Sequence, residues 1–208
     1  MVIAAFDVDG TLTTRDCVRP FLERVAGRRR LATSLLRRPL ATIVATARRD
    51  RDRFKEIIVG GSLRGKRVAE VETMGEQFAQ YVLANWLRPD TLRRLRWHQQ
   101  SGHRTVIVSA SLAAYLRPLA LRLGIDDVLC TDSNRAGDRY GDRLSGLNCR
   151  ADEKRRRLDE WLEEQRWVNA EVWAYGDSAG DRELLARADH AVWVNGAIIS
   201  EIPEVVAG

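Results

Sequence analysis

This sequence of 208 residues contains no apolar run of the length that crosses a bilayer, which takes about 20 consecutive apolar residues. Its best stretch, residues 31–47, is interrupted by Arg37, Arg38 and Pro39. The apolar start, residues 1–6, lacks the basic residues and the length of a signal peptide and leads directly into acidic residues. We therefore expect neither a membrane span nor a leader, and we predict a cytoplasmic protein.

Cysteine is scarce as well, since the chain has only Cys17, Cys130 and Cys149. Their number is odd, and no two of them stand at the CxxC spacing that zinc and redox sites use. This argues against a disulfide framework and a structural zinc site, and it agrees with a reducing compartment. The histidines have no metal-ligand spacing either, and no role is assigned to them: His98, His103 and His190.

The net charge of +5 is distributed unevenly along the chain. Residues 15–66 contain 15 Lys and Arg against 5 Asp and Glu, so this segment carries +10 and the rest carries −5. A basic segment on an otherwise acidic protein favours an anionic partner, such as a phosphate ester, an anionic lipid or a nucleic acid. No nucleic-acid-binding motif accompanies it, so we expect no specific nucleic-acid partner. A solvated arginine-rich surface is the alternative interpretation.

The spacing of apolar residues changes twice along the chain. Residues 2–6 are typical of a buried strand, whereas residues 18–86 show only the spacing of amphipathic helices. Strands and helices then alternate, with strands predicted at 105–108, 127–130, 172–175 and 191–194, helices at 89–100, 112–123, 152–165 and 181–188, and a hairpin at 133–147. This alternation predicts an α/β fold with a doubly wound, Rossmann-like parallel sheet. Residues 1–14 and 88–208 would form this core, and residues 15–87 an all-helical cap inserted after the first strand.

Polar side chains stand where three of the predicted strands end. Open parallel sheets bind ligands at this carboxyl edge. Asp7 and Asp9 follow the first strand, and Gly10 lets backbone N–H groups approach an anion closely. Ser109 follows the second predicted strand and either caps the next helix or donates to a phosphate oxygen. Asp177 follows the predicted strand at 172–175.

One further acidic residue, Asp181, and one basic residue, Lys154, extend this set. Asp177 and Asp181 lie four residues apart across a glycine-rich turn, which suits a hard cation with oxygen ligands. A turn followed by a helix cap is the alternative. Lys154 lies near a predicted helix start, where the helix dipole disfavours a positive charge, so an anionic partner is indicated. Its neighbours Asp152 and Glu153 are an alternative source of compensation.

These features together resemble, in order and spacing, the four motifs of the haloacid dehalogenase superfamily of phosphohydrolases, subfamily IB. The helical insertion after the first motif resembles the cap of the phosphoserine-phosphatase-like branch. The resemblance implies a Mg²⁺-dependent phosphomonoesterase that works through an aspartyl-phosphate. Asp7 would be the nucleophile and Asp9 the general acid and base.

The same resemblance implies the remaining roles. Mg²⁺ would be held by Asp7, by the backbone carbonyl of Asp9 and by Asp177. Backbone N–H groups near Gly10, together with Ser109 and Lys154, would bind the phosphate and stabilise its developing charge. Asp181 would orient Lys154 or a water on the metal.

The resemblance leaves the substrate open. Asp16 stands where phosphoserine phosphatases carry a Glu that helps to bind the substrate amine, and Ser109-Ala110-Ser111 replaces their usual Ser-Gly-Gly. A small phosphate monoester, such as phosphoserine or histidinol phosphate, is the first hypothesis, with Asp16 as the selecting residue. A phosphatase of lipid phosphates of the phosphatidylglycerophosphate or lysophosphatidate class is the second. A non-catalytic anion-binding module is the third.

The lipid hypothesis includes peripheral contact with an anionic membrane. It depends on a stripe of apolar residues between arginines in the predicted cap. The stripe consists of Leu35, Leu36, Leu40, Ile43 and Val44, and the arginines are Arg28–Arg30, Arg37 and Arg38. Packing of the stripe among the cap's own helices is the alternative.

Overall fold

The computed structural model describes residues 1–36 and 39–194, with only the backbone of 34–36, and its centre is a five-stranded sheet in the order β3-β2-β1-β6-β7. Every strand pair in it is parallel. The strands are β1 (Val2–Phe6), β2 (Arg104–Leu112), β3 (Asp127–Thr131), β6 (Glu171–Gly176) and β7 (His190–Trp193). β1 is apolar throughout because strands flank it on both sides and helices cover both of its faces. The predicted Rossmann-like fold is confirmed.

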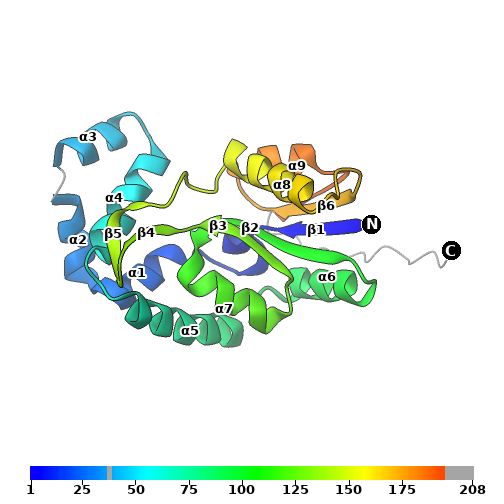
Figure 1. Cartoon of the computed structure of the whole chain (residues 1–208), viewed down its shortest axis with the longest axis horizontal. Helices are drawn as coiled ribbons and strands as arrows, with labels where there is room; N and C mark the ends of the chain where they lie inside the picture. The colour runs from blue at the N-terminus through cyan, green and yellow to red at the C-terminus, as the bar shows by residue number, and fades with distance from the viewer. Residues whose placement is uncertain (37–38, 195–208) are drawn as a thin grey trace.

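Helices cover both faces of this sheet (Figure 1). They are α6 (Pro89–Gln100) and α7 (Ala113–Leu123) on one face, and α8 (Asp152–Glu164) and α9 (Arg182–Arg187) on the other. Alternate residues of β1 face opposite layers, as the strand period requires. Ala4 and Phe6 pack in the hydrophobic cluster that includes α6 and α7, and Ile3 and Ala5 pack with α8 and α9.

Strand β2 differs from the prediction in its length. We expected it to end at Val108, but it continues to Leu112, and its register with β3 shifts between Ser109 and Leu112. Such an irregularity re-aims side chains at the edge of a sheet. Ser109 therefore lies inside a distorted strand end rather than at a helix start.

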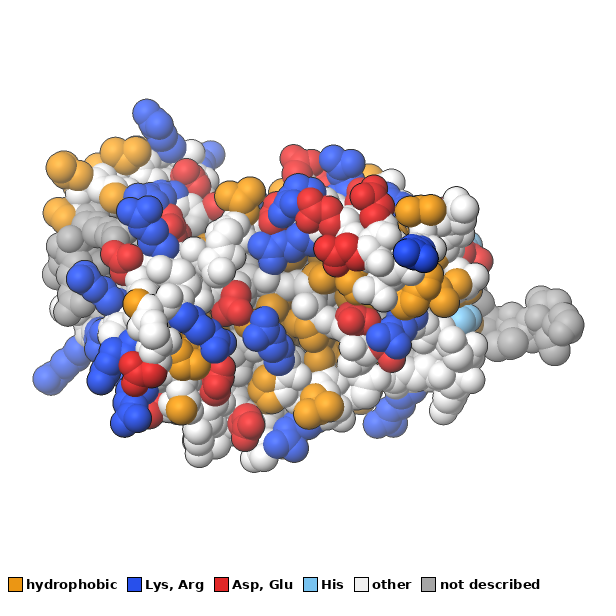
Figure 2. Space-filling model, viewed as in Figure 1, with side chains coloured by type: hydrophobic (Ala, Val, Ile, Leu, Met, Phe, Trp, Pro, Cys, Tyr) orange, Lys and Arg blue, Asp and Glu red, His pale blue; other side chains and the backbone are white. Residues whose placement is uncertain are grey.

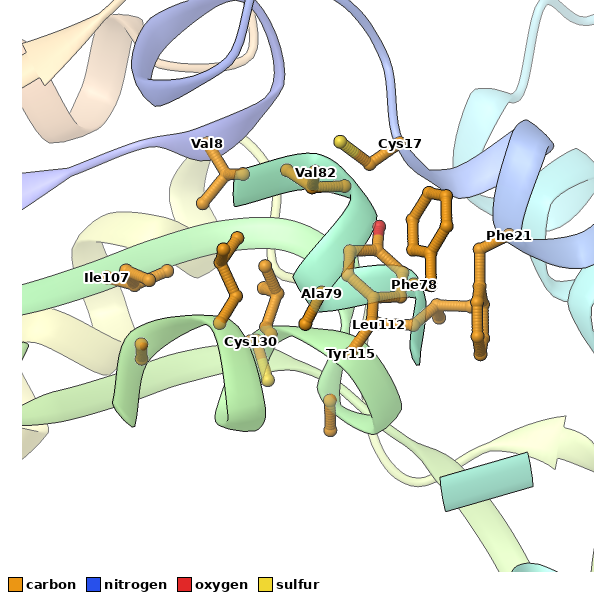
Figure 3. Packing of buried hydrophobic residues seen from close by; sticks show 14 of the residues in the cluster. Val8, Cys17, Phe21, Phe78, Ala79, Val82, Ile107, Leu112, Tyr115 and Cys130 are labelled. Atoms are coloured by element: carbon orange, nitrogen blue, oxygen red, sulfur yellow. The ribbon is translucent and has the colours of Figure 1, made fainter. Parts of the chain in front are cut away.

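Within residues 15–87, as far as the structure describes them, there are five helices and no strand. They are α1 (Val18–Ala26), α2 (Arg28–Leu36), α3 (Pro39–Ala47), α4 (Arg51–Leu63) and α5 (Val68–Asn85). α5 packs so closely on α7 that a Cβ on Gly75 would lie 2.0 Å from the carbonyl oxygen of Ala114. Beside this contact, the ring of Tyr115 lies 4.9 Å from Phe21 and 5.2 Å from Phe78 (Figure 3). One aromatic cluster thus joins α1 and α5 to α7, which covers the sheet. The domain bounds stay a prediction.

The predicted hairpin is present as β4 (Ser133–Ala136) and β5 (Arg139–Leu144), which pair antiparallel. It packs closely against α4, so that a Cβ on Gly60 would lie only 2.1 Å from the carbonyl oxygen of Asp142. Tyr140 also exchanges backbone hydrogen bonds with the turn after α4, at 2.8 Å from Gly65 N and 2.9 Å to Lys66 O. The hairpin therefore helps to fix the inserted helices over the sheet.

Helix α3 lies at the end of the molecule away from the sheet (Figure 1). Leu40, Ile43 and Val44 are exposed there by 78%, 64% and 48% of their surface, so the packing interpretation is wrong for these three. The side chains of Leu35 and Leu36, and Arg37 and Arg38 entirely, lie outside the described residues. None of the described helices is long and apolar enough to cross a membrane.

Candidate active site

A tight turn over residues 8–12 follows Asp7 and carries Asp9 beyond the end of β1. Asp7 still belongs to the sheet, since its N–H donates to the carbonyl of Tyr175 at 2.9 Å. The chain then reverses at Gly10, whose φ is +86°, a conformation that favours glycine. A Cβ at this position would lie 2.3 Å from Oδ2 of Asp177. Glycine therefore lets the turn and Asp177 approach each other.

Lys154, in the first turn of α8, lies buried between two carboxylates. Its Nζ donates to Oδ1 of Asp7 at 2.5 Å and also to Oδ1 of Asp181. Burial alone would lower the pKa of Lys154, but the two carboxylates outweigh it and raise that pKa above its ordinary value. The second oxygen of Asp181 accepts from the backbone N–H of Ser178 at 2.9 Å and from its hydroxyl at 2.7 Å. With both oxygens occupied, Asp181 holds Lys154 in position.

Asp177 lies beside the two carboxylates that bind Lys154. Oxygen atoms of Asp7, Asp177 and Asp181 all lie within 4.8 Å of one another. Burial raises the pKa of Asp177 to about 6, and the charges of Asp7 and Asp181 add to the effect. Three carboxylates that repel one another, two of which bind the single Lys154 cation, fit a hard cation such as Mg²⁺. Asp7 and Asp177 are the predicted ligands in this group, and the role of the Asp9 carbonyl stays a prediction.

The Asp9 carboxylate is held away from these three acids. It accepts hydrogen bonds from the backbone N–H of Cys17 at 2.9 Å and from the hydroxyl of Ser111 at 2.5 Å. Ser111 in turn accepts from the hydroxyl of Tyr115 at 2.6 Å. Burial, with the charges of Asp16 and Asp7, raises the pKa of Asp9 to about 7. Asp9 can therefore carry a proton near neutral pH, as a general acid must.

One cavity of about 460 Å³ brings every predicted site residue together. Its walls include Asp7, Asp9, Gly10, Asp16, Ser109, Lys154, Asp177 and Asp181. Ser109 is buried and accepts a hydrogen bond at its hydroxyl from Ser111 N at 3.2 Å. Arg15 and Arg150 also line the cavity, so its cationic groups suit an anion. Sequence reasoning did not single out either arginine.

The structure adds Lys55, which sequence reasoning missed. From α4 its ammonium donates to the carbonyl of Ala110 and, at 2.9 Å, to Oδ1 of Asn148. The amide of Asn148 also donates to Asp52 at 2.6 Å, so two residues of α4 bind the two ends of this amide. Burial lowers the pKa of Lys55 to about 8. Its signal in the sequence is weak because it is one of 15 basic residues in a basic segment.

Comparison with known proteins agrees with this architecture. Protein CicA of Caulobacter vibrioides (strain NA1000 / CB15N) is 38% identical over 189 residues, which cover 90% of this chain and 83% of CicA. A protein with unknown function from Bordetella pertussis Tohama I has a similar structure, with a TM-score of 0.68 and 23% identity over 88% of this chain and 85% of that one. A phospho-aspartyl intermediate analogue of phosphoserine phosphatase has a TM-score of 0.59 and 16% identity, over 90% and 83% of the two chains. The family model of haloacid dehalogenase-like hydrolases matches residues 4–186, and the chain belongs to that family.

Proposed function

We propose that this protein is a Mg²⁺-dependent phosphomonoesterase in which Asp7 is the nucleophile. One observation carries the proposal: the buried Asp7 carboxylate is bonded to Lys154 and shares a cavity with Asp9, an acid whose pKa is raised to about 7. A nucleophile and a separate proton donor are what a phosphate ester needs for displacement of its alcohol. Membership of a hydrolase family supports the same chemistry.

The proposed reaction has two displacements. In the first, an oxygen of Asp7 bonds to phosphorus while the ester oxygen leaves and takes the proton of Asp9, so that an alcohol is released. In the second, Asp9, now a carboxylate, accepts a proton from a water molecule that attacks the aspartyl-phosphate. Inorganic phosphate leaves, Asp7 is restored, and Asp9 is protonated again.

The site must also overcome repulsion between a carboxylate nucleophile and an anionic phosphate. Burial raises the pKa of Asp7, and the Lys154 cation opposes this and favours the ionised nucleophile. Ser109 and the backbone N–H groups near Gly10 would donate to the phosphate oxygens. When bound by Asp7 and Asp177, Mg²⁺ supplies positive charge to both the nucleophile and the phosphate.

Two classes of alcohol are candidates for the leaving group of the substrate. A small polar alcohol, as in phosphoserine or histidinol phosphate, is the candidate that the family resemblance suggests, and Asp16 would then select it. Asp16 lines the cavity and accepts from the backbone N–H of Arg19 at 3.1 Å. A lipid-like alcohol is the second candidate. It is favoured by a neighbouring apolar cavity and by the exposed apolar residues of α3.

The test is phosphate release from p-nitrophenyl phosphate, phosphoserine, histidinol phosphate and lysophosphatidate, with Mg²⁺ and after EDTA. The variant is Asp7→Asn, and the matched control is Asp138→Asn, whose side chain is exposed on the hairpin. We expect metal-dependent release that Asp7→Asn loses and Asp138→Asn keeps. Acid quenching during turnover should leave a phosphate on the peptide that contains Asp7. Phosphate binding without release, by folded protein, would support the anion-binding module instead.

A further inference from the structure

A second cavity, of about 610 Å³, adjoins the first and shares Asp9, Asp16 and Ala110 with it. Resting on the proposed phosphatase activity, we propose that this cavity binds the leaving group, and that the leaving group is an apolar chain of several carbon atoms. The cavity would act as a chain-length selector. Its volume is within the range of sites for drug-sized ligands and exceeds what a serine side chain needs.

The walls of this cavity are mainly apolar and come from three helices. They include Val18 and Leu22 of α1, Leu31 of α2, and Phe54, Ile58 and Val59 of α4. Of these, Val18, Leu31, Phe54 and Ile58 are only partly buried. These side chains therefore still present surface that an apolar ligand would remove from water.

The charged residues on the same wall have partners within the protein. Glu23 pairs with Arg19 at 3.0 Å and with Arg28 at 3.4 Å. The ammonium of Lys55 is bonded to Ala110 and Asn148. An amino-acid leaving group would bring an ammonium and a carboxylate into this apolar space, where polar groups without hydrogen bonds are costly. An alkyl chain brings neither.

The position of Asp9 gives the two cavities a common geometry. Asp9 is the proposed donor of the proton to the ester oxygen, and it lines both cavities. A scissile bond beside Asp9 would have its phosphate among the cationic groups of the first cavity. Its alcohol carbon atoms would then extend into the second. The division between polar and apolar walls thus falls where the bond is broken.

Such a substrate could arrive from solution or from a lipid surface. Helix α3, which contacts α2 and α4 of the cavity wall, exposes Leu40, Ile43 and Val44. Figure 2 shows hydrophobic and basic side chains side by side at this end of the molecule. Both sources present the same chemistry, a phosphate on an apolar chain, so the experiment must separate them.

The experiment measures kcat/KM for n-alkyl phosphates from ethyl to octyl, below their micelle concentrations. We expect a rise of about threefold to fourfold for each methylene until the cavity is filled. Ile58→Asn should reduce the octyl-to-ethyl ratio at least about tenfold. The control is Val168→Asn, at an exposed apolar position that does not line the cavity, and the ratio should be retained. In a second arm, lysophosphatidate in phosphatidylglycerol vesicles turning over faster than in phosphatidylcholine vesicles would indicate a lipid source, and equal rates a soluble one.

Binding of n-alkylphosphonates, which cannot be hydrolysed at phosphorus, tests the cavity without turnover. Affinity that rises with chain length supports the inference even where Ile58→Asn fails to fold. Equal kcat/KM and equal affinity along the series, while p-nitrophenyl phosphate is hydrolysed, would overturn the inference and leave the phosphatase intact. Chain-dependent phosphonate binding without hydrolysis of any ester would overturn the proposed activity and leave an alkyl-anion site.

Discussion

Replacing Gly10 with alanine should disable the metal site while leaving the fold in place. The new Cβ would lie 2.3 Å from Oδ2 and 2.6 Å from Cγ of Asp177, where ordinary contact begins near 3.4 Å. The Asp177 carboxylate would therefore have to move by about 1 Å, and its hydrogen bond from Thr11, at 3.3 Å, would be disturbed. A displacement of about 1 Å in a catalytic group can reduce the rate about 100-fold.

The same substitution also strains the backbone, and this loss of stability must be separated from the steric overlap between the new Cβ and Asp177. At φ +86° an alanine is disfavoured by roughly 1–2 kcal/mol relative to glycine. Gly102 provides the control, because its φ is +71° and a Cβ there would meet nothing within 4 Å. Gly102→Ala should therefore lose similar stability and keep its dependence on Mg²⁺.

The assay is phosphate release against Mg²⁺ concentration, alongside urea unfolding, for the wild type and both variants. We expect Gly10→Ala to need at least about tenfold more Mg²⁺ for half-maximal rate and to turn over about 100-fold more slowly. Gly102→Ala should match the wild type in both respects. A Gly10→Ala protein with wild-type Mg²⁺ dependence and rate would refute the argument that this glycine makes room for Asp177.

Three further predictions concern other buried groups. Lys154→Met leaves two buried carboxylates without their cation, so the free energy of unfolding in EDTA should fall by about 3 kcal/mol; an unchanged urea midpoint would contradict this. Burial lowers the pKa of His98 to about 3, below the ordinary value near 6.5, so its contribution to stability is complete above pH of about 6.5 and is lost as the pH falls. Between about pH 7 and about pH 5 the wild type should lose about 2 kcal/mol more than His98→Gln in urea unfolding, and equal losses would refute the effect. Lys55→Met removes the bond to Ala110, which lines both cavities, and should lower kcat/KM about tenfold; the control Lys66→Met should not, and equal effects would exclude a specific role for Lys55.

The sheet and most of the site could be predicted because their signals are local. Asp7, Asp9 and Gly10 directly follow a buried strand, and residues in that position of a parallel sheet lie at its carboxyl edge. Lys154 was harder to interpret because three arginines follow it, and its resemblance to a known motif indicated its role. Its burial between two acids explains physically why a lysine occupies the start of α8.

Other features depend on contacts between distant parts of the chain. Lys55 meets Asn148 across 93 residues, and Ser111 meets Asp9 across 102, so neither partner has a local pattern. The extension of β2 beyond Ser109 depends on pairing with β3. The histidines had no ligand spacing, yet His98 is buried between Tyr175 and His103, at 2.8 Å from each. No short window of sequence contains the pairs Lys55–Asn148, Asp9–Ser111 or His98–Tyr175.

The meeting of the two cavities at Asp9 has a kinetic consequence for the proposed reaction. The alcohol leaves first, while phosphate is still covalently held by Asp7, and the space that it vacates adjoins the base that activates water. An apolar chamber that retains the alcohol would therefore make it a competitor of water for the same aspartyl-phosphate. Added alcohols that fill the chamber should accordingly accept the phosphoryl group from Asp7 in place of water. The ratio of phosphoryl transfer to hydrolysis should follow the chain length of the alcohol.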